Sequence, residues 1–294
     1  MTIAAPGHGQ MAVPDIDWSS EGWTPAEKDQ MLRWYMEAHG TGDTSVARFA
    51  PFMIQHNPAG FKRYRRHVRY HGRAVPGPLL FLHTYAVLGN GDGALYQMLS
   101  AKQRGFTKPQ VLETLAFAFL TSGPIMNGAA AATSAYLFAW DDDGKPSKVQ
   151  WPQGWAPDPA AFRSGMDLTT DEFTAGDLDA LKAWHQRVKG EVPRWVGAWA
   201  KLGGHGYKTN RIRYEIGFGV SLPKQLFPLF QLHLATYRVW TEAARQALLH
   251  ARALGCTRDQ VVETMESAFT CGGEQMMAGV LTDRVIDVLE SFPD

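Results

Sequence analysis

The chain has 294 residues, of which 45% are hydrophobic and 20% are charged. This length and composition fit about two soluble globular domains at ~100–200 residues per domain. Basic and acidic residues number 29 each, and this balance excludes a general electrostatic attraction to nucleic acid or to a membrane surface. Cys256 and Cys271 form no CxxC pair and no zinc pattern, which favours a reduced compartment.

The segment from Met1 to Trp18 has no basic stretch followed by an apolar run, so it is not predicted to be a signal peptide. No run of ~18 or more apolar residues is evident that would span a bilayer. We therefore expect a cytoplasmic protein with neither a membrane nor a nucleic acid as its partner.

In chain order, a first helical copy is predicted over residues 18–143. It opens with a helix-start signal, Thr24 to Glu27, with a proline at the first helical position. Later in this copy Gly105 ends a helix, and Thr107 to Gln110 starts the next one with a capping box. Residues 144–167 contain several prolines and two tryptophans, and they form a linker that we expect to pack on a surface. A second copy is predicted over residues 168–294.

The two copies align at a spacing of 150 residues, which is the signature of an internal repeat. Helical spacing of apolar residues recurs in both copies, and no alternating pattern long enough for a sheet is present. The fold class is therefore predicted to be all-α, with a tandem repeat. The aligned pairs include Thr24/Thr174, Trp34/Trp184, Arg63/Arg213, Tyr64/Tyr214, His83/His233, Gly105/Gly255, Thr107/Thr257, Gln110/Gln260 and Gly123/Gly273.

The late helical pair of each copy carries a family resemblance. The segment from Ala101 through Gly105 and Thr107 to Leu115, followed by Gly123, resembles the carboxymuconolactone decarboxylase and AhpD-like family. The segment from Ala251 to Met265 is similar to it as well. The resemblance implies two AhpD-like helical domains in one chain. It also implies a homo-oligomer, either a trimer of tandem chains or a dimer, because small members of this family assemble from separate subunits.

This sequence departs from the family at its catalytic positions. The cysteines of the peroxidase branch would fall at Asn90 and Gly93 in the first copy, and the histidine would fall at Gln97. The second copy lacks these residues too. Dithiol reduction of a peroxide needs an attacking thiolate and a resolving thiol, so this chain is not expected to be a dithiol peroxidase.

Three residues are candidates for catalysis. His83 and His233 lie in apolar helical stretches at matching positions of the repeat, where burial shifts the pKa of an imidazole. They are either acid/base groups or core histidines, and we expect them to come near one another if the copies pair symmetrically. Glu274 replaces a proline of the first copy and is either a general acid/base or an exposed residue at a helix start.

Substrate contacts are predicted at Arg63, Tyr64, Arg213, Tyr214 and Asn127. Arginine binds a carboxylate through two parallel hydrogen bonds, although a structural ion pair with a stacked tyrosine is an equal alternative. His67 and His71 have the spacing of a metal pair on a helix, but no carboxylate completes a site. No metal or cofactor is therefore predicted.

These patterns predict a cofactor-independent lyase or hydrolase, decarboxylase-like, that acts by acid/base chemistry on a small carboxylated or ring-containing, anionic substrate. Two alternatives stay open. One is a non-catalytic ligand-binding or assembly relative of the family, and the other is a metal-dependent enzyme that uses histidines.

Overall fold

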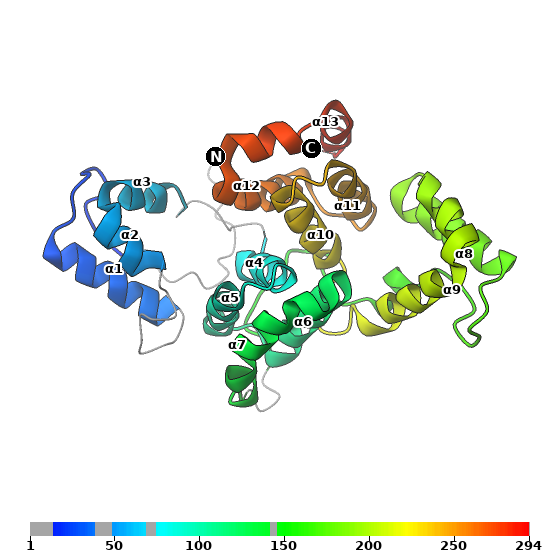
Figure 1. Cartoon of the computed structure of the whole chain (residues 1–294). Helices are drawn as coiled ribbons and strands as arrows, with labels where there is room; N and C mark the ends of the chain where they lie inside the picture. Colours follow the sequence, from blue (N-terminus) through cyan, green and yellow to red (C-terminus); the bar gives the residue numbers. More distant parts are fainter. Residues whose placement is uncertain (1–13, 39–48, 69–74, 142–145, 294) are drawn as a thin grey trace. The chain divides into compact units, whose positions relative to one another are not determined.

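The computed structural model describes residues 14–38, 49–68, 75–141 and 146–293. Within these ranges the regular structure is helical and no strand occurs, which confirms the all-α prediction. The chain divides into two compact units, Met1–Gln150 (unit 1) and Trp151–Asp294 (unit 2). Figure 1 shows the helices of both units along the chain.

Unit 1 contains an N-terminal helical group and a C-terminal group built on a long hairpin. In the C-terminal group α4 packs against α5 and α6, and α5 packs against α7. The helices are α1 (Pro25–Ala38), α2 (Phe49–His56), α3 (Pro58–Val68), α4 (Gly77–Val87), α5 (Gly91–Gln103), α6 (Lys108–Ser122), the 3-10 turn η2 (Gly123–Met126) and α7 (Asn127–Phe138).

Unit 2 has a similar order of helices, in which the single kinked helix α9 takes the place of α2 and α3. Its helix α10 packs against α11 and α12, and α8 contacts both α9 and α11. The elements are η3 (Pro159–Phe162), α8 (Ala175–Lys189), α9 (Arg194–Gly217), α10 (Leu226–Tyr237), α11 (Thr241–Ala253), α12 (Arg258–Val280) and α13 (Asp283–Glu290).

The helix boundaries follow the predicted local signals. In the capping box of α12, Thr257 Oγ1 accepts from the Gln260 amide and Gln260 Oε1 accepts from the Thr257 amide. The glycines Gly105 and Gly255 follow their helices with φ of 87° and 79°, a left-handed conformation that side chains other than glycine resist. These matched ends confirm the sequence signals in both units.

The linker tryptophans pack as expected. Trp155 is buried, and its ring stacks on that of Trp151 at 6.2 Å between centroids. Within unit 2 the Gln225 amide donates to the Gly154 carbonyl, and Lys224 forms an ion pair with Asp158. The C-terminal part of the predicted linker therefore belongs structurally to unit 2.

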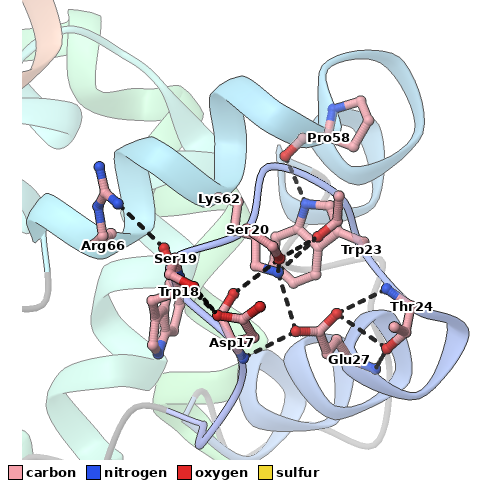
Figure 2. A network of polar contacts seen from close by, with 11 residues as sticks. Asp17, Trp18, Ser19, Ser20, Trp23, Thr24, Glu27, Pro58, Lys62 and Arg66 are labelled. Carbon is pink, nitrogen blue, oxygen red and sulfur yellow. Dashed lines mark hydrogen bonds and ion pairs between the residues drawn. The ribbon is translucent and has the colours of Figure 1, made fainter.

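A buried lysine holds the N-terminal group of unit 1 together (Figure 2). Lys62 on α3 is 1% exposed, and its Nζ donates to Ser20 Oγ at 2.8 Å and to the Gly22 carbonyl at 2.6 Å. It also pairs with the Glu27 carboxylate at 3.0 Å. The same carboxylate accepts from the Thr24 amide and so caps α1. One carboxylate thus joins the start of α1 to the middle of α3.

Unit 2 repeats this arrangement around Lys208 on α9, which is also 1% exposed. Its Nζ donates to Thr170 Oγ1 at 3.1 Å and to the Glu172 carbonyl at 2.6 Å, and it pairs with Asp177 at 3.2 Å. Asp177 in turn caps α8 by accepting from the Thr174 amide. A buried ammonium with three oxygen partners is therefore common to both units.

The lysine networks reveal a shift in the repeat. Lys62 and Lys208 are 146 residues apart, whereas the carboxylates that they bind are 150 apart. Arg65 lies over Trp34 at 4.9 Å and Arg211 lies over Trp184 at 4.4 Å, again a difference of 146 between the arginines. The break in α9 at Gly203 falls 146 residues after Asn57, which separates α2 from α3. The predicted constant spacing of 150 residues between the copies is therefore wrong across α2, α3 and α9, where matching residues are 146 apart.

Substituting methionine for either buried lysine should cost about 3 kcal/mol of unfolding free energy, because it leaves a buried carboxylate without its cation. Lys208→Met and Lys62→Met should both show this loss in chemical denaturation. Lys182→Met is the control, since Lys182 pairs with Asp179 on the surface and should lose at most about 1 kcal/mol. Equal losses in all three variants would contradict the structural role of the buried pairs.

Unit 2 carries a strained turn that unit 1 avoids. Val239 has φ of 56° and follows α10, and the corresponding residue after α4 is Gly89 with φ of 71°. A left-handed conformation costs a side-chain-bearing residue about 1–2 kcal/mol. The valine is also 41% exposed, so burial of its side chain offsets only part of this cost.

Val239→Gly should therefore raise the melting temperature, because relief of strain exceeds the roughly 0.5–1 kcal/mol of added chain entropy. The reciprocal Gly89→Val should lower it, since its Cβ would lie 2.8 Å from the Ile125 carbonyl oxygen. Val262→Gly, on the helical part of α12, serves as the control and should destabilise. A fall in melting temperature for Val239→Gly would show that the turn is not strained.

Candidate functional site

The two repeat-matched histidines lie in the helical cores of separate units. His83 on α4 is fully buried, with its ring 5.3 Å from that of Phe117 on α6. His233 on α10 is fully buried as well, and burial lowers its pKa to about 3. Both imidazoles are therefore core groups, and their expected approach to one another stays a prediction.

The predicted arginine–tyrosine pairs differ in their surroundings. Arg63 is exposed and forms an ion pair with Glu21, and Tyr64 is 36% exposed. Arg213 is exposed, whereas Tyr214 packs edge-on against Phe162 at 5.4 Å. Burial raises the pKa of Tyr214 to about 12. The two pairs are not equivalent in structure, because the repeat shifts by four residues here.

The other predicted site residues lie at helix breaks or outside the described residues. Glu274 is exposed next to Gly273, where α12 is broken, and Asn127 is exposed at the start of α7. His67 lies on α3, and His71 falls outside the described residues. No group of three His, Cys, Asp or Glu side chains suited to a metal occurs in the described part of the chain.

A different set of side chains gathers around the indole of Trp184 in unit 2, and we call it the Trp184 cluster. His185 lies edge-on to this indole at 4.9 Å, and His250 of α11 does so at 5.6 Å. The Arg211 guanidinium lies over the same ring at 4.4 Å, and the Lys189 ammonium lies at 6.0 Å from its centroid. Helices α8, α9 and α11 thus bring two imidazoles and two cations to one buried aromatic side chain.

The imidazoles of the cluster are buried and uncharged at neutral pH. Burial lowers the pKa of both His185 and His250 to about 3, and the nearby charges of Lys189 and Arg211 add to the effect for both imidazoles. His185 Nε2 lies 3.5 Å from the Tyr207 hydroxyl. Among the described residues, His185 Nδ1 and His250 Nε2 have no hydrogen-bond partner. Buried polar atoms without partners are uncommon, and they mark places where a ligand or water is accommodated.

The two cations differ in their own partners. Arg211 bonds the Glu215 carboxylate through Nε and Nη2, at 3.1 and 2.9 Å, and donates from Nη2 to the Phe162 carbonyl. Lys189 has no carboxylate within 4.0 Å among the described residues, because the nearby Glu191 is bound by Arg245 and Gln246. Burial lowers the pKa of Lys189 to about 8, and the Arg211 charge contributes next. The amine is therefore partly neutral near physiological pH.

Unit 1 has the same scaffold at this place, with other residues at the positions of the two imidazoles. Trp34 and Arg65 correspond to Trp184 and Arg211, but Tyr35 takes the place of His185. Ser100 takes the place of His250. Clustered groups with shifted pKa values are typical of functional sites, so unit 2 holds the stronger candidate. His185 and His250 were not predicted from the sequence, because the two copies were compared for residues that both of them keep.

No protein-family model, no curated protein and no solved structure matches this chain. In the described part, the stretch Lys108–Phe138 is long and apolar enough to cross a membrane by length and composition. The sequence alone did not predict this stretch as a membrane span, because polar residues interrupt its apolar residues. Gly123, with φ of 57° and ψ of −135°, breaks the stretch between α6 and η2.

The buried imidazoles make the stability of unit 2 dependent on pH. In the unfolded chain the imidazoles of His185, His250 and His233 take up protons near pH 6.5. In the folded chain the same imidazoles stay neutral until about pH 3. Stability should therefore be highest above pH 6.5 and fall toward pH 3, by about 1.4 kcal/mol per pH unit for each imidazole. Denaturant titrations between pH 4 and 7 measure this slope.

His250→Gln should reduce the slope by about 1.4 kcal/mol per pH unit, because one buried imidazole is removed. The matched control is His205→Gln, since His205 is exposed on α9 and its removal leaves the buried imidazoles in place. An unchanged slope in His250→Gln would show that this histidine takes up its proton equally in the folded and unfolded chain.

Proposed function

We propose that this chain is a cofactor-independent lyase or hydrolase that acts by acid/base chemistry on a small carboxylated substrate, with its reaction site in unit 2. The observation that carries the proposal is the Trp184 cluster. It combines neutral imidazoles, whose ring nitrogens can accept a proton, with cations that attract a carboxylate. The resemblance to the AhpD-like family supports a tandem pair of such domains and a decarboxylase-like reaction.

In this proposal His250 and His185 act as bases, and each can return its proton as an acid once it has accepted one from the substrate. A neutral imidazole accepts a proton from a bound substrate, and the adjacent cations stabilise negative charge that develops during the reaction. Arg211 and Lys189 hold the carboxylate of the substrate against the Trp184 ring. The sequence-predicted triplet of His83, His233 and Glu274 is the alternative assignment, and the same variants distinguish the two.

A panel of small β-keto acids and lactone carboxylates, followed by NMR, should reveal turnover by the full chain. His250→Gln and His185→Phe should each lower kcat/KM by about 10²-fold or more, because they remove a proton-transfer group. His83→Gln in unit 1 is the matched control and should change kcat/KM by less than roughly tenfold. Circular dichroism checks that each variant keeps its helices.

Loss of turnover in His83→Gln or His233→Gln, with His250→Gln unaffected, would overturn the assignment to the Trp184 cluster. If ligands from the panel shift the melting temperature but none reacts, the enzyme proposal is wrong and the chain is a binding protein. Elemental analysis of the purified chain tests the metal-dependent alternative: stoichiometric zinc or iron would contradict cofactor-independent chemistry.

A further inference from the structure

We propose that Lys189 is a covalent amine site that captures a small keto acid as a Schiff base on the Trp184 cluster. This inference rests on the proposed function, and it names the substrate class as a carboxylate that also carries a ketone. The proposal comes from where Lys189 lies and from which groups surround it.

Lys189 ends α8, one helical turn after His185. Residues four apart share a helix face, so the amine and the imidazole lie on the same side of α8. The Trp184 ring, which both contact, also packs against His250 from α11. A molecule bound at the Lys189 amine would therefore have imidazole nitrogens beside it.

The surroundings of Lys189 are unusual for a lysine in a folded protein. Its nearest acidic neighbour in sequence, Glu191, instead accepts hydrogen bonds from Arg245 and Gln246. The Arg211 guanidinium shares its aromatic ring. An amine that is desolvated and placed next to another cation is the arrangement that activates lysine as a nucleophile.

Two consequences follow from this arrangement. With its pKa lowered to about 8, a substantial fraction of Lys189 is neutral at physiological pH, and only the neutral amine attacks a carbonyl carbon. The Nη1 atom of Arg211 has no protein partner among the described residues, whereas Nε and Nη2 bind Glu215 and the Phe162 carbonyl. Nη1 is therefore free to bind the carboxylate of a substrate.

The chemistry balances without an added reactant. The neutral Lys189 nitrogen adds to the ketone carbon, and loss of one water together with uptake of one proton from solvent gives a protonated imine. For a β-keto acid, the bond to the carboxylate then breaks, carbon dioxide leaves, and the electron pair passes to the iminium nitrogen to form an enamine. A proton from water adds to the enamine carbon, and hydrolysis of the resulting iminium releases the ketone, returns the proton taken up in the first step and restores the amine.

Borohydride reduction tests the proposal on the full chain. The protein is incubated with acetoacetate or with acetone and reduced with sodium borohydride, and the modified lysine is located by peptide mass spectrometry. We expect labelling at Lys189 to exceed that at the exposed Lys182 on the same helix by on the order of tenfold or more, because more of its amine is neutral. Acetoacetate should label Lys189 faster than acetone does, since its carboxylate is attracted by Arg211.

Lys189→Arg should abolish this label while preserving the positive charge, and Lys182→Arg should leave it intact. Equal labelling of all exposed lysines, or none at Lys189, would overturn the Schiff-base proposal. If no label forms but His250→Gln still abolishes turnover, the acid/base proposal stands alone. If Lys189 is labelled but the histidine variants turn over normally, the covalent site stands and the acid/base assignment is wrong.

Discussion

The buried lysine–carboxylate pair is the interaction on which the N-terminal half of each unit depends. Lys62 and Lys208 sit where α3 and α9 cross the start of α1 and α8, and each binds the carboxylate that caps that helix. Burying an ammonium is costly unless oxygens surround it, so the loop before each capped helix must supply a hydroxyl and a carbonyl. This requirement fixes the loop, the helix start and the crossing helix together.

This constraint also explains where the Trp184 cluster lies. Arg211 follows Lys208 by three residues on α9, so the turn of α9 that carries the buried lysine also carries the guanidinium that covers Trp184. The lysine network therefore positions one side of the cluster, and α11 completes the other side with His250. In unit 1 the same scaffold places Arg65 over Trp34, and Tyr35 and Ser100 take the places of His185 and His250.

Local signals in the sequence predicted most of the fold. Capping boxes such as Thr257 to Gln260, and glycines such as Gly255, act within a few residues, so they can be recognised without the rest of the structure. The all-α class followed from helical spacing of apolar residues. The shift to a spacing of 146 could not be predicted this way, because the matching Arg–Tyr dipeptides at Arg63 and Arg213 favoured the wrong alignment.

The candidate site was harder to predict for a physical reason. His185 and His250 are separated by 65 positions in the sequence, and only the packing of α8 against α11 brings them to one indole. Their shifted pKa values arise from burial, which depends on the same packing. His83 and His233 were found because both copies keep them, but shared position selects core residues as readily as reactive ones.

The four-residue shift has a consequence for how the two halves of the chain can diverge. Four residues are close to one helical turn of 3.6, so the shift moves a side chain along the helix axis while keeping it on nearly the same face. The spacing between matching residues changes from 150 to 146 between α1/α8 and α2/α9, and it returns to 150 before α4 and α10. A chimera of the two halves joined inside this segment therefore keeps the buried lysine in register only if its junction follows the spacing of 146, because a junction at the spacing of 150 duplicates or deletes about one helical turn.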